Sequence, residues 1–538
     1  MGKVGSNPTG TAIFRTRRVR VITLSLRHLT VDDGRDSGSF GPTEGVAKQT
    51  HRIRAACLYF AVVRFPMTIH EVRPPHQAGR HPESAPVEAR YRRRMRRADL
   101  LLVLSWVSVA VVVALFLAQS GTTGFASVTD AVTSVGVVCG LVGTNLILLM
   151  LVLAARVPVI DRTFGHDKAM HAHRRLGKPA FYLILAHVVL LLIGYGISSG
   201  VDPIAEIAVM WTTLPDMPLA FLGFGLLVVV IVSSFVAVRR RFPYEVWHGI
   251  HLVSYAAVLV AIPHQLSVGG LFLDGTLQRA YWLALYVAVV GLVAVYRFLS
   301  PVARSLRHGL TVRRIVEVAP GVVSIELAGR RLRELQATGG QFLVWRFWTG
   351  ATWWHAHPLS LSAVPSDTSL RITVRALGEG SGSLASVPVG TRVSIEGPYG
   401  IFTQEARTRP NVVLVAAGIG VTPVRALIEQ ADFAPGEATV IVRAPGNEPP
   451  YLWDEMRELC ARKGAPLFLV DGARPAGVAS WQSADAVARG YTLASYAPEI
   501  ANSDLYVCGP APWADLVVAD AHRQGLRAEQ LHLERFDW

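Results

Sequence analysis

The chain has 538 residues, of which 51% are hydrophobic and 17% are charged, and its mean hydropathy is +0.35. Soluble proteins carry about a quarter charged residues, so this composition excludes a purely soluble chain and predicts a membrane protein with a soluble part. The formal net charge is +14, but residues 1–97 alone hold 19 basic and 7 acidic side chains, an excess of 12. The excess of basic over acidic residues therefore lies in the N-terminal arm and does not indicate a nucleic-acid-binding surface.

The cysteines and the composition of the arm exclude several further classes. The cysteines, Cys57, Cys139, Cys460 and Cys508, form no C-x-x-C pair, which speaks against a zinc knuckle, a local iron–sulfur motif and a disulfide framework. Residues 1–97 mix arginine clusters with glycine, proline and serine, and we expect this arm to be mostly disordered. It has no apolar run long enough to span a bilayer and no signal-peptide cleavage pattern.

Six apolar runs follow the arm, most of them near the roughly 20 residues that a helix needs to cross hydrocarbon. They are Leu100–Ala118, Val132–Ala155, Pro179–Ile197, Pro218–Val238, Val246–Ile262 and Tyr281–Val295. Arginine and lysine gather before the first run and after the second, fourth and sixth runs, whereas aspartate and glutamate dominate the other loops. This pattern predicts a six-helix transmembrane domain over residues 98–300, in the plasma membrane, with both termini in the cytoplasm.

Histidines lie on the third and fifth helices of this domain. His173 and His187 are 14 residues apart, which on a helix is about 21 Å of rise and nearly whole turns, so both rings leave one face. His251 and His264 are 13 apart, and we expect Pro263 to supply the local distortion that aligns them. Both helices run in the same direction. His173 is therefore predicted to face His251 near the cytoplasmic side, and His187 to face His264 near the outer side.

Two imidazoles on facing helices suit haem that is held for electron transfer. A single membrane histidine is more often a hydrogen-bonded packing residue, but four histidines in two spaced pairs favour haem ligation. His166, His171 and His248 are expected to be structural or interfacial, and they are the alternatives if one of the four ligands is wrong.

The run His173-Arg-Arg-Leu-Gly177 with His187, followed by Trp247, His251 and His264, resembles the haem-binding core of the ferric reductase and NADPH oxidase superfamily. The resemblance covers about residues 98–300. It implies two b-type haems held between histidines of the third and fifth of six helices.

Short alternating strands separated by glycine and proline follow Arg297 and predict an antiparallel β-barrel over residues 306–405. One strand is similar to the flavin-binding strand of ferredoxin-reductase-like domains, although Leu359 stands where an aromatic is usual. A glycine-rich turn downstream offers backbone N–H groups to a pyrophosphate. The candidate FAD-binding residues are His357, Pro358, Leu359, Ser360, Gly380, Ser381 and Gly382.

From Asn411 the pattern becomes a buried strand, a glycine turn and a helix, which predicts an α/β doubly wound domain over residues 410–538. Its G-x-G-x-x-P turn resembles the nicotinamide-binding motif of ferredoxin reductases. The same resemblance implies that the strand and turn Leu505–Pro510 lie beneath the nicotinamide, with Cys508 near the hydride. The candidate nucleotide-binding residues are Gly418, Gly420, Thr422, Pro423, Gly509 and Pro510.

Two further features of this domain bear on function. A C-terminal aromatic shields the flavin in the family, and either Trp538 or Phe536 is available here, with Trp538 preferred. Arg443 and Arg474 follow apolar strand-like runs, and guanidinium groups suit the 2′-phosphate of NADPH. They are equally compatible with ordinary surface charges.

Together these motifs predict a membrane oxidoreductase that moves electrons from NADPH, with NADH as the alternative donor, through FAD and two haems to an acceptor outside. Ferric iron chelates are the favoured acceptor, and a dioxygen-reducing NADPH oxidase is the alternative. Two rivals are a transporter or proton channel with relay histidines, and a flavoreductase merely anchored by its helices. A haem spectrum separates both rivals from the main interpretation.

The arm is predicted to be dispensable. Met67 and Met95 both precede the first long apolar run, so a start later than Met1 is compatible with the sequence. Residues 1–66 hold no span, no periodic core and no ligand pair. A chain started at Met67 should therefore keep its haem and its NADPH-dependent activity, and loss of either would contradict this prediction.

Overall fold

The computed structural model describes residues 84–120, 123–268, 275–350, 352–446 and 449–535, which all belong to the compact unit Arg73–Trp538. The predictions for the arm before residue 84, and those for Phe536 and Trp538, lie outside the described residues.

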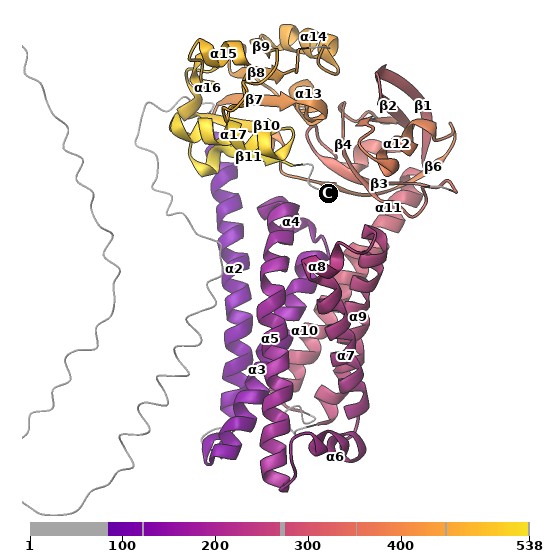
Figure 1. Cartoon of the computed structure of the whole chain (residues 1–538), viewed down its shortest axis with the longest axis vertical. Coiled ribbons are helices and arrows are strands. Elements are labelled where there is room, and N and C mark those ends of the chain that lie inside the picture. Colours follow the sequence, from indigo (N-terminus) through magenta and orange to yellow (C-terminus); the bar gives the residue numbers. More distant parts are fainter. Residues whose placement is uncertain (1–83, 121–122, 269–274, 351, 447–448, 536–538) are drawn as a thin grey trace, which may run out of the picture. The chain divides into compact units, whose positions relative to one another are not determined.

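Helices occupy the first part of the described chain (Figure 1). Their bounds are α2 Ser84–Ser120, η1 Thr123–Phe125, α3 Val128–Ala154, α4 Pro158–Phe164, α5 His166–Ser199, α6 Ala205–Thr213, α7 Met217–Ser234, α8 Val236–Arg239, α9 Tyr244–Ser267, α10 Leu277–Val293, η2 Ala294–Leu299 and α11 Ser300–His308.

Within the described residues, six helical stretches are long and apolar enough to cross a membrane. They are Ala89–Gln119, Val128–Ala154, His166–Ser199, Met217–Ser234, Tyr244–Ser267 and Leu277–His308. The last of these is continuous through α10, η2 and α11, so it extends well beyond the apolar run that predicted it. The expected six-helix membrane domain is confirmed.

Local signals explain where some of these helices begin and end. The Ser127 hydroxyl accepts a hydrogen bond from the Asp130 N–H at 3.1 Å, and the Asp130 carboxylate accepts one from the Ser127 N–H, a capping box that starts α3. Helix α5 ends at Ser199 and is capped by Gly200, whose φ of +70° is a conformation that favours glycine. Pro263 lies inside α9, which continues past it to Ser267.

The next segment forms a six-stranded antiparallel sheet in the order β4-β3-β6-β1-β2-β5. The elements are β1 Leu310–Ala319, β2 Val322–Ala328, η3 Leu332–Leu335, β3 Phe342–Phe347, β4 His357–Ser360, β5 Ser369–Arg375, α12 Glu379–Gly382, η4 Ser383–Ser386, β6 Arg392–Tyr399 and η5 Gln404–Ala406. Its core holds Ile325, Trp345, Phe347 and Ile372, each fully buried. Alternation of buried and less buried residues along β6 matches the period of two that predicted strands here.

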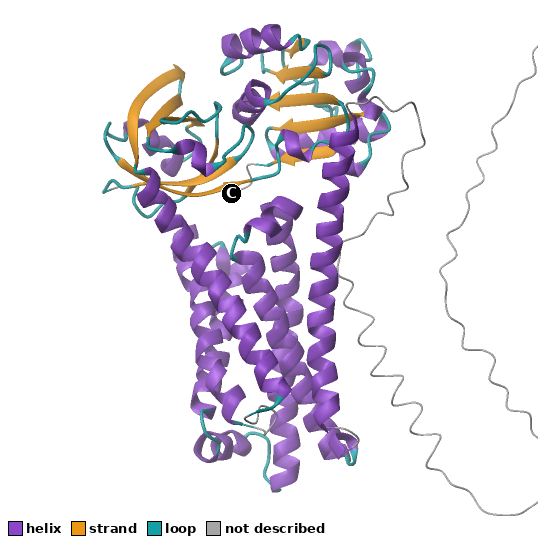
Figure 2. Ribbon diagram, turned by 180° about the vertical axis from the view of Figure 1, so that it is seen from behind, coloured by secondary structure: helices purple, strands orange, loops and turns teal. Residues whose placement is uncertain are grey.

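The last segment is a five-stranded parallel sheet in the order β11-β10-β7-β8-β9. Figure 2 shows its strands as orange arrows with purple helices around them. The elements are β7 Asn411–Ala417, η6 Gly418–Gly420, α13 Val421–Gln430, β8 Ala438–Arg443, α14 Trp453–Lys463, β9 Leu467–Val470, α15 Ala484–Ala488, α16 Leu493–Tyr496, η7 Ile500–Asn502, β10 Ser503–Cys508, α17 Ala511–Arg523, η8 Ala528–Gln530 and β11 Leu531–Glu534.

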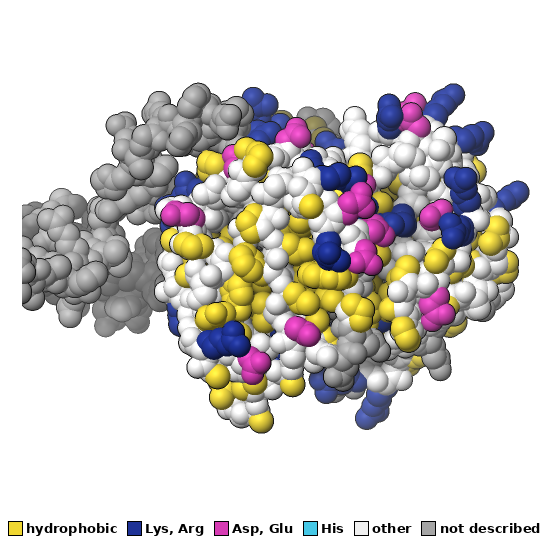
Figure 3. All heavy atoms as spheres, turned by 90° about the horizontal axis from the view of Figure 1, so that it is seen from above, with side chains coloured by type: hydrophobic (Ala, Val, Ile, Leu, Met, Phe, Trp, Pro, Cys, Tyr) yellow, Lys and Arg dark blue, Asp and Glu magenta, His cyan; other side chains and the backbone are white. Residues whose placement is uncertain are grey.

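Both faces of the parallel sheet are covered, as a doubly wound fold requires. One hydrophobic cluster joins β7 to α13 and α14 through Leu414, Ile428 and Met456, and another joins the opposite face to α17 through Val415 and Val517. Strand order reverses between β7 and β10, so their carboxyl ends form the topological switch point where such folds bind ligands. The predicted fold class is confirmed. The surface seen in Figure 3 mixes acidic and basic side chains with apolar ones.

Candidate functional site

The inner histidine pair comes together between α5 and α9. The ring centroids of His173 and His251 are 6.0 Å apart, with an interplanar angle of 69°. This separation of the ring centres is close to that of two imidazoles on opposite sides of one metal ion, since a metal–imidazole nitrogen bond is about 2 Å. The Nδ1 atom of His173 lies 3.0 Å from the Met150 carbonyl oxygen. An Nδ1–H that donates to this oxygen leaves the Nε2 lone pair available to a metal, as is usual for ligating histidines.

The outer pair consists of His187 and His264, and His187 is oriented in the same way as His173. The Nδ1 atom of His187 lies 2.9 Å from the Gly136 carbonyl oxygen, which again frees Nε2. His264 lies close enough to His187 to interact with it electrostatically. The Nδ1 atom of His264 is buried.

Glycines of α3 make room for the outer imidazole, and sequence reasoning missed them. A Cβ atom on Gly140 would lie 2.4 Å from His187 Nδ1, far inside contact distance. A Cβ atom on Gly136 would lie 3.1 Å from Leu190 Cβ, and one on Gly143 would lie 2.9 Å from Ile184 Cδ1, both on α5. The spacing Gly136-x-x-x-Gly140 inside an apolar run is the small-residue signal that could have found this face.

The other histidines of this region are engaged elsewhere. His166 is buried, lies 3.4 Å from Asp161 and stacks on Tyr399 with ring centroids 5.6 Å apart. His171 is exposed, and His248 stacks on Tyr244. These placements agree with the expectation that they are structural or interfacial.

Trp247 lies directly against the inner pair. Its ring stacks on His251 with centroids 5.2 Å apart and an interplanar angle of 28°. Its Nε1 atom is buried and has no hydrogen-bond partner among the described residues. Within those residues no three histidine, cysteine or acidic side chains converge on one point, and a bis-imidazole haem site needs only two.

The predicted flavin strand forms β4, paired with β3 so that His357 lies opposite Trp345. His357 Nε2 and Ser360 Oγ are both buried and have no hydrogen-bond partner in the described part of the chain. Pro358 and Leu359 are half-buried between them, and the Leu359 carbonyl accepts a hydrogen bond from Trp345 Nε1 at 3.0 Å. Two orphaned polar atoms on one short strand fit a strand whose partner is a bound cofactor.

The His357 imidazole is neutral at neutral pH. Burial lowers its pKa to about 4, and the nearby charges of His355 and Arg346 act in the same direction, against Glu245. His357 therefore offers hydrogen bonds to a ligand rather than a fixed positive charge.

The glycine-rich turn lies beside this strand. A Cβ atom on Gly380 would stand 3.6 Å from His357 Cε1. The Ser381 hydroxyl accepts a hydrogen bond from the Leu377 N–H at 2.9 Å, and the Gly382 N–H donates to the Gly378 carbonyl at 2.8 Å. Hydrogen bonds within the segment from Leu377 to Gly382 thus fold the turn, and Gly380 lies next to His357 of the flavin strand.

At the switch point, the two predicted nucleotide motifs meet. A Cβ atom on Gly420 would lie 2.2 Å from the Cys508 carbonyl oxygen and 2.8 Å from the Gly509 nitrogen, so only glycine permits this approach. Gly418 has a φ of +55°, which also favours glycine. The turn leads into α13, whose first residues include Thr422 and Pro423. Pro510 similarly precedes α17.

Cys508 ends β10 with no exposed surface, and the register places it opposite Glu534 of β11. Burial raises the pKa of the Cys508 thiol well above its ordinary value, and the Glu534 carboxylate adds to this rise. Burial also raises the pKa of the Glu534 carboxyl, with a further contribution from Asp167. Burial therefore favours the protonated, neutral form of each group. Sequence reasoning did not single out Glu534, and Trp538, the other residue predicted to act in catalysis, lies outside the described residues.

The two arginines predicted to bind a 2′-phosphate differ. Arg443 is 7% exposed, and its guanidinium donates hydrogen bonds to the carbonyls of Val470, at 3.2 Å, and of Gly472. Arg474 is exposed and lies close enough to Arg443 to lower its pKa, although burial is the larger cause. The guanidinium of Arg443 is committed to the backbone, so Arg474 is the better candidate.

Comparisons with known proteins find similarity for the membrane part of the chain and for a reductase module. Residues 139–262 match the family described as "Ferric reductase like transmembrane component". The matched range contains His173, His187 and His251, and His264 lies two residues beyond it.

The curated relatives match a reductase module. The ferredoxin reductase component of 3-ketosteroid-9-alpha-monooxygenase from Rhodococcus rhodochrous is 28% identical over 236 residues, which are 42% of this chain and 64% of the relative. A flavohemoprotein from Xylella fastidiosa is 27% identical over 206 residues, 37% of this chain and 50% of the relative. This chain thus spans less than two thirds of either protein.

Two solved structures are similar in part. The FAD/NAD-binding domain of nitric oxide dioxygenase from Vibrio cholerae is 22% identical with a TM-score of 0.33, covering 43% of this chain and 98% of that chain. A flavohemoglobin from Malassezia yamatoensis is 16% identical with a TM-score of 0.37, covering 76% of this chain and 99% of that chain.

Proposed function

We propose that this chain, which joins a ferric-reductase-like transmembrane domain to a ferredoxin-reductase-type FAD- and NAD(P)-binding module, is an NAD(P)H-dependent oxidoreductase that passes electrons across a membrane. The proposed units are the membrane domain over residues 98–300, the FAD domain over 306–405 and the nucleotide domain over 410–538. The observation that carries the proposal is the pairing of imidazoles from α5 and α9 inside the spans of a chain that also holds a nucleotide switch point.

The nucleotide domain would bind the electron donor. Backbone N–H groups of the Gly418–Gly420 turn and the start of α13 suit a pyrophosphate, because the N–H groups at a helix N-terminus lack partners within the helix. Cys508 and Glu534, both buried, would form a dry floor beneath the nicotinamide. Gly509 and Pro510 set the adjoining turn, and Trp538 would cover the flavin.

The FAD domain and the bundle would hold the other groups. His357 and Ser360 would donate to or accept from the flavin and its ribityl chain, and the turn at Gly380–Gly382 would receive the pyrophosphate. His173 with His251, and His187 with His264, would each ligate one b-type haem. When bound, FAD converts a two-electron hydride donor into a source of single electrons, and each haem accepts one electron at a time.

Orientation and acceptor complete the proposal. Arginine-rich loops after the second, fourth and sixth spans support a cytoplasmic reductase module and cytoplasmic termini, in a plasma membrane. The acceptor would then lie on the opposite side. The description of the matching family supports ferric iron complexes as that acceptor.

The first test is haem content. A fully loaded preparation of the whole chain should contain two low-spin b-type haems per FAD, because each of two imidazole pairs ligates one iron. A pyridine haemochrome assay with flavin quantification measures this ratio. A preparation without haem would contradict the proposal and favour an anchored flavoreductase or a protein with relay histidines. A single haem per FAD would show that one of the two histidine pairs does not bind haem. If the protein forms superoxide and does not reduce ferric chelates, the acceptor is dioxygen and not ferric iron.

A second prediction concerns the nucleotide. Arg474→Ala should lower kcat/KM for NADPH by about tenfold and leave kcat/KM for NADH nearly unchanged, because a charge-assisted hydrogen bond to the 2′-phosphate is lost. Arg489→Ala, which removes another exposed arginine of the same domain, is the matched control. Equal kcat/KM for the two nucleotides in the unmodified chain would refute the NADPH preference.

A further inference from the structure

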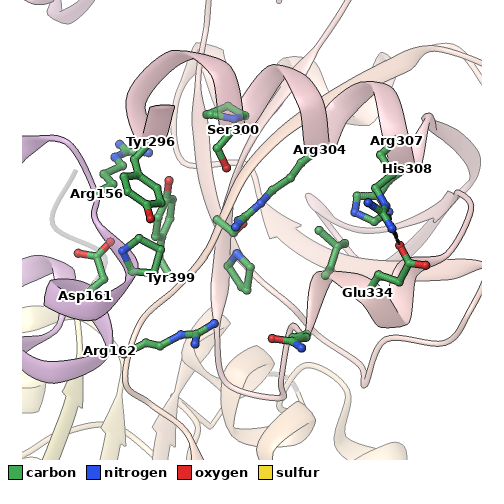
Figure 4. Close-up of a pocket in the computed structure, with 16 residues that line it drawn as sticks. Arg156, Asp161, Arg162, Tyr296, Ser300, Arg304, Arg307, His308, Glu334 and Tyr399 are labelled. Carbon is green, nitrogen blue, oxygen red and sulfur yellow. Dashed lines mark hydrogen bonds and ion pairs between the residues drawn. The ribbon is translucent and has the colours of Figure 1, made fainter. Parts of the chain in front are cut away.

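A polar cavity of about 270 Å³ lies between α4, the C-terminal end of the last span and strand β6 (Figure 4). Helix α4 supplies Asp161 and Arg162, α11 supplies Ser300 and Arg304, and β6 supplies Tyr399. None of the residues on the flavin strand β4 or in the glycine turns of the nucleotide domain lines it. The cavity is therefore separate from the sites assigned above.

Its basic lining is only partly neutralised. Two arginines are paired with acids, Arg156 with Glu396 at 2.6 Å and Arg307 with Glu334. Arg162 has no hydrogen-bond or ion-pair partner among the described residues, and it is exposed at the cavity. Figure 4 shows the guanidinium groups of Arg162 and Arg304 pointing into the cavity from opposite sides.

Arg304 also has donors to spare. Its guanidinium donates one hydrogen bond, from Nη1 to the Gly397 carbonyl, and it makes no ion pair within the described residues. A guanidinium has five N–H donors in a planar fork that matches the oxygens of a phosphate. Two such groups facing each other across one cavity suit a phosphate anion.

An acceptor complements these donors. Asp161 is 5% exposed, and its Oδ1 atom lies 3.4 Å from His166 Nδ1. Its Oδ2 atom is buried and has no hydrogen-bond partner in the described part of the chain. A ligand that fits the cavity should therefore carry a hydroxyl donor next to its phosphate.

The position of the cavity indicates where such a ligand comes from. The last span is continuous over Leu277–His308, and its end is amphipathic. Leu299, Val302 and Leu306 are 62%, 58% and 73% exposed on one face, at helical spacing, whereas the cavity-lining Ser300 and Arg304 project elsewhere. A helix end with a bare apolar stripe and basic side chains lies at the boundary between acyl chains and headgroups.

We propose that this cavity binds the headgroup of an anionic phospholipid of the phosphatidylglycerol type. Arg162 and Arg304 hold the phosphodiester, Asp161 Oδ2 accepts a hydrogen bond from a headgroup hydroxyl, and the acyl chains follow the apolar stripe formed by Leu299, Val302 and Leu306. The site links α4 to α11 and β6 through the lipid. It is independent of the proposed electron transfer, so either proposal can fail alone.

The test titrates phosphatidylglycerol into the detergent-solubilised whole chain and counts bound lipid by native mass spectrometry. Arg162→Gln and Arg304→Gln should each weaken binding by about tenfold, since each removes a charge-assisted contact, and Arg162→Lys should retain much of it. Arg241→Gln is the control, because Arg241 is an exposed arginine of another cytoplasmic loop that does not line the cavity. Unchanged flavin content and melting temperature show that each variant is folded.

Three results would overturn the proposal. Equal losses in Arg241→Gln and Arg162→Gln would mean general attraction to the membrane surface. Binding of phosphatidylcholine as tight as that of phosphatidylglycerol would remove the charge selectivity. Displacement of the lipid by glycerol 3-phosphate at comparable concentrations would identify a site for soluble phosphate compounds instead. Selective phosphatidylglycerol binding that depends on Arg162 and Arg304, and resists glycerol 3-phosphate, supports it.

Discussion

Replacing His187 with leucine is expected to leave one haem per FAD instead of two and to abolish reduction of an impermeant extracellular acceptor. Leucine fills much of the imidazole's volume but offers no lone pair, so the outer site loses a ligand. His173 and His251 form the other pair, with ring centroids 6.0 Å apart, and they should keep their haem. Haemochrome assays measure the first effect, and the rate of ferric chelate reduction measures the second.

Two companion variants sharpen this experiment. His173→Leu should also leave one haem per FAD, but it should remove the inner site, so NADPH should reduce the flavin and no haem. His171→Leu is the matched control, since it removes an exposed histidine of the same helix. Full haem content and normal acceptor reduction in His187→Leu would show that the outer ligand is wrong, and His166, His171 and His248 would have to be tested in its place.

Adding a single methyl group to Gly140 is expected to weaken the outer haem site while leaving both of its imidazoles in place. The new Cβ atom would lie 2.4 Å from His187 Nδ1 and 2.7 Å from Cε1, so the ring must move. That movement breaks the hydrogen bond to the Gly136 carbonyl, which fixes the orientation of the ring. Gly140→Ala should therefore reduce outer haem to below about half of its normal occupancy, at a cost of about 1–3 kcal/mol in stability.

The glycines of the bundle also supply the control. A Cβ atom on Gly225 of α7 would meet no other atom within 4 Å, so Gly225→Ala should keep both haems and slightly favour the helix. Haem per FAD, measured in both variants after purification, compares them directly. Two haems in Gly140→Ala would mean that the His187 ring does not lie against Gly140 in the haem-loaded protein.

Features that depend on neighbours in the chain could be predicted from the sequence. Hydropathy over about 20 residues determines whether a helix can cross a bilayer, and the six spans follow from it. The alternation along the strands and the turn at Gly418–Gly420 likewise depend on local backbone geometry, so the barrel and the doubly wound sheet were expected. The 14-residue spacing of His173 and His187 also indicated a shared helix face.

Only the tertiary structure decided which distant groups meet. The hydrogen bonds that orient His173 and His187 come from the carbonyls of Met150 and Gly136 on another helix, and nothing near the histidines in sequence specifies them. Arg443 and Arg474 look alike as strand-end arginines, yet packing commits one to the backbone and leaves the other exposed. The cavity between Arg162 and Arg304 joins residues 142 positions apart. Such contacts depend on how helices and strands pack, and packing is determined by the whole chain rather than by any short segment of it.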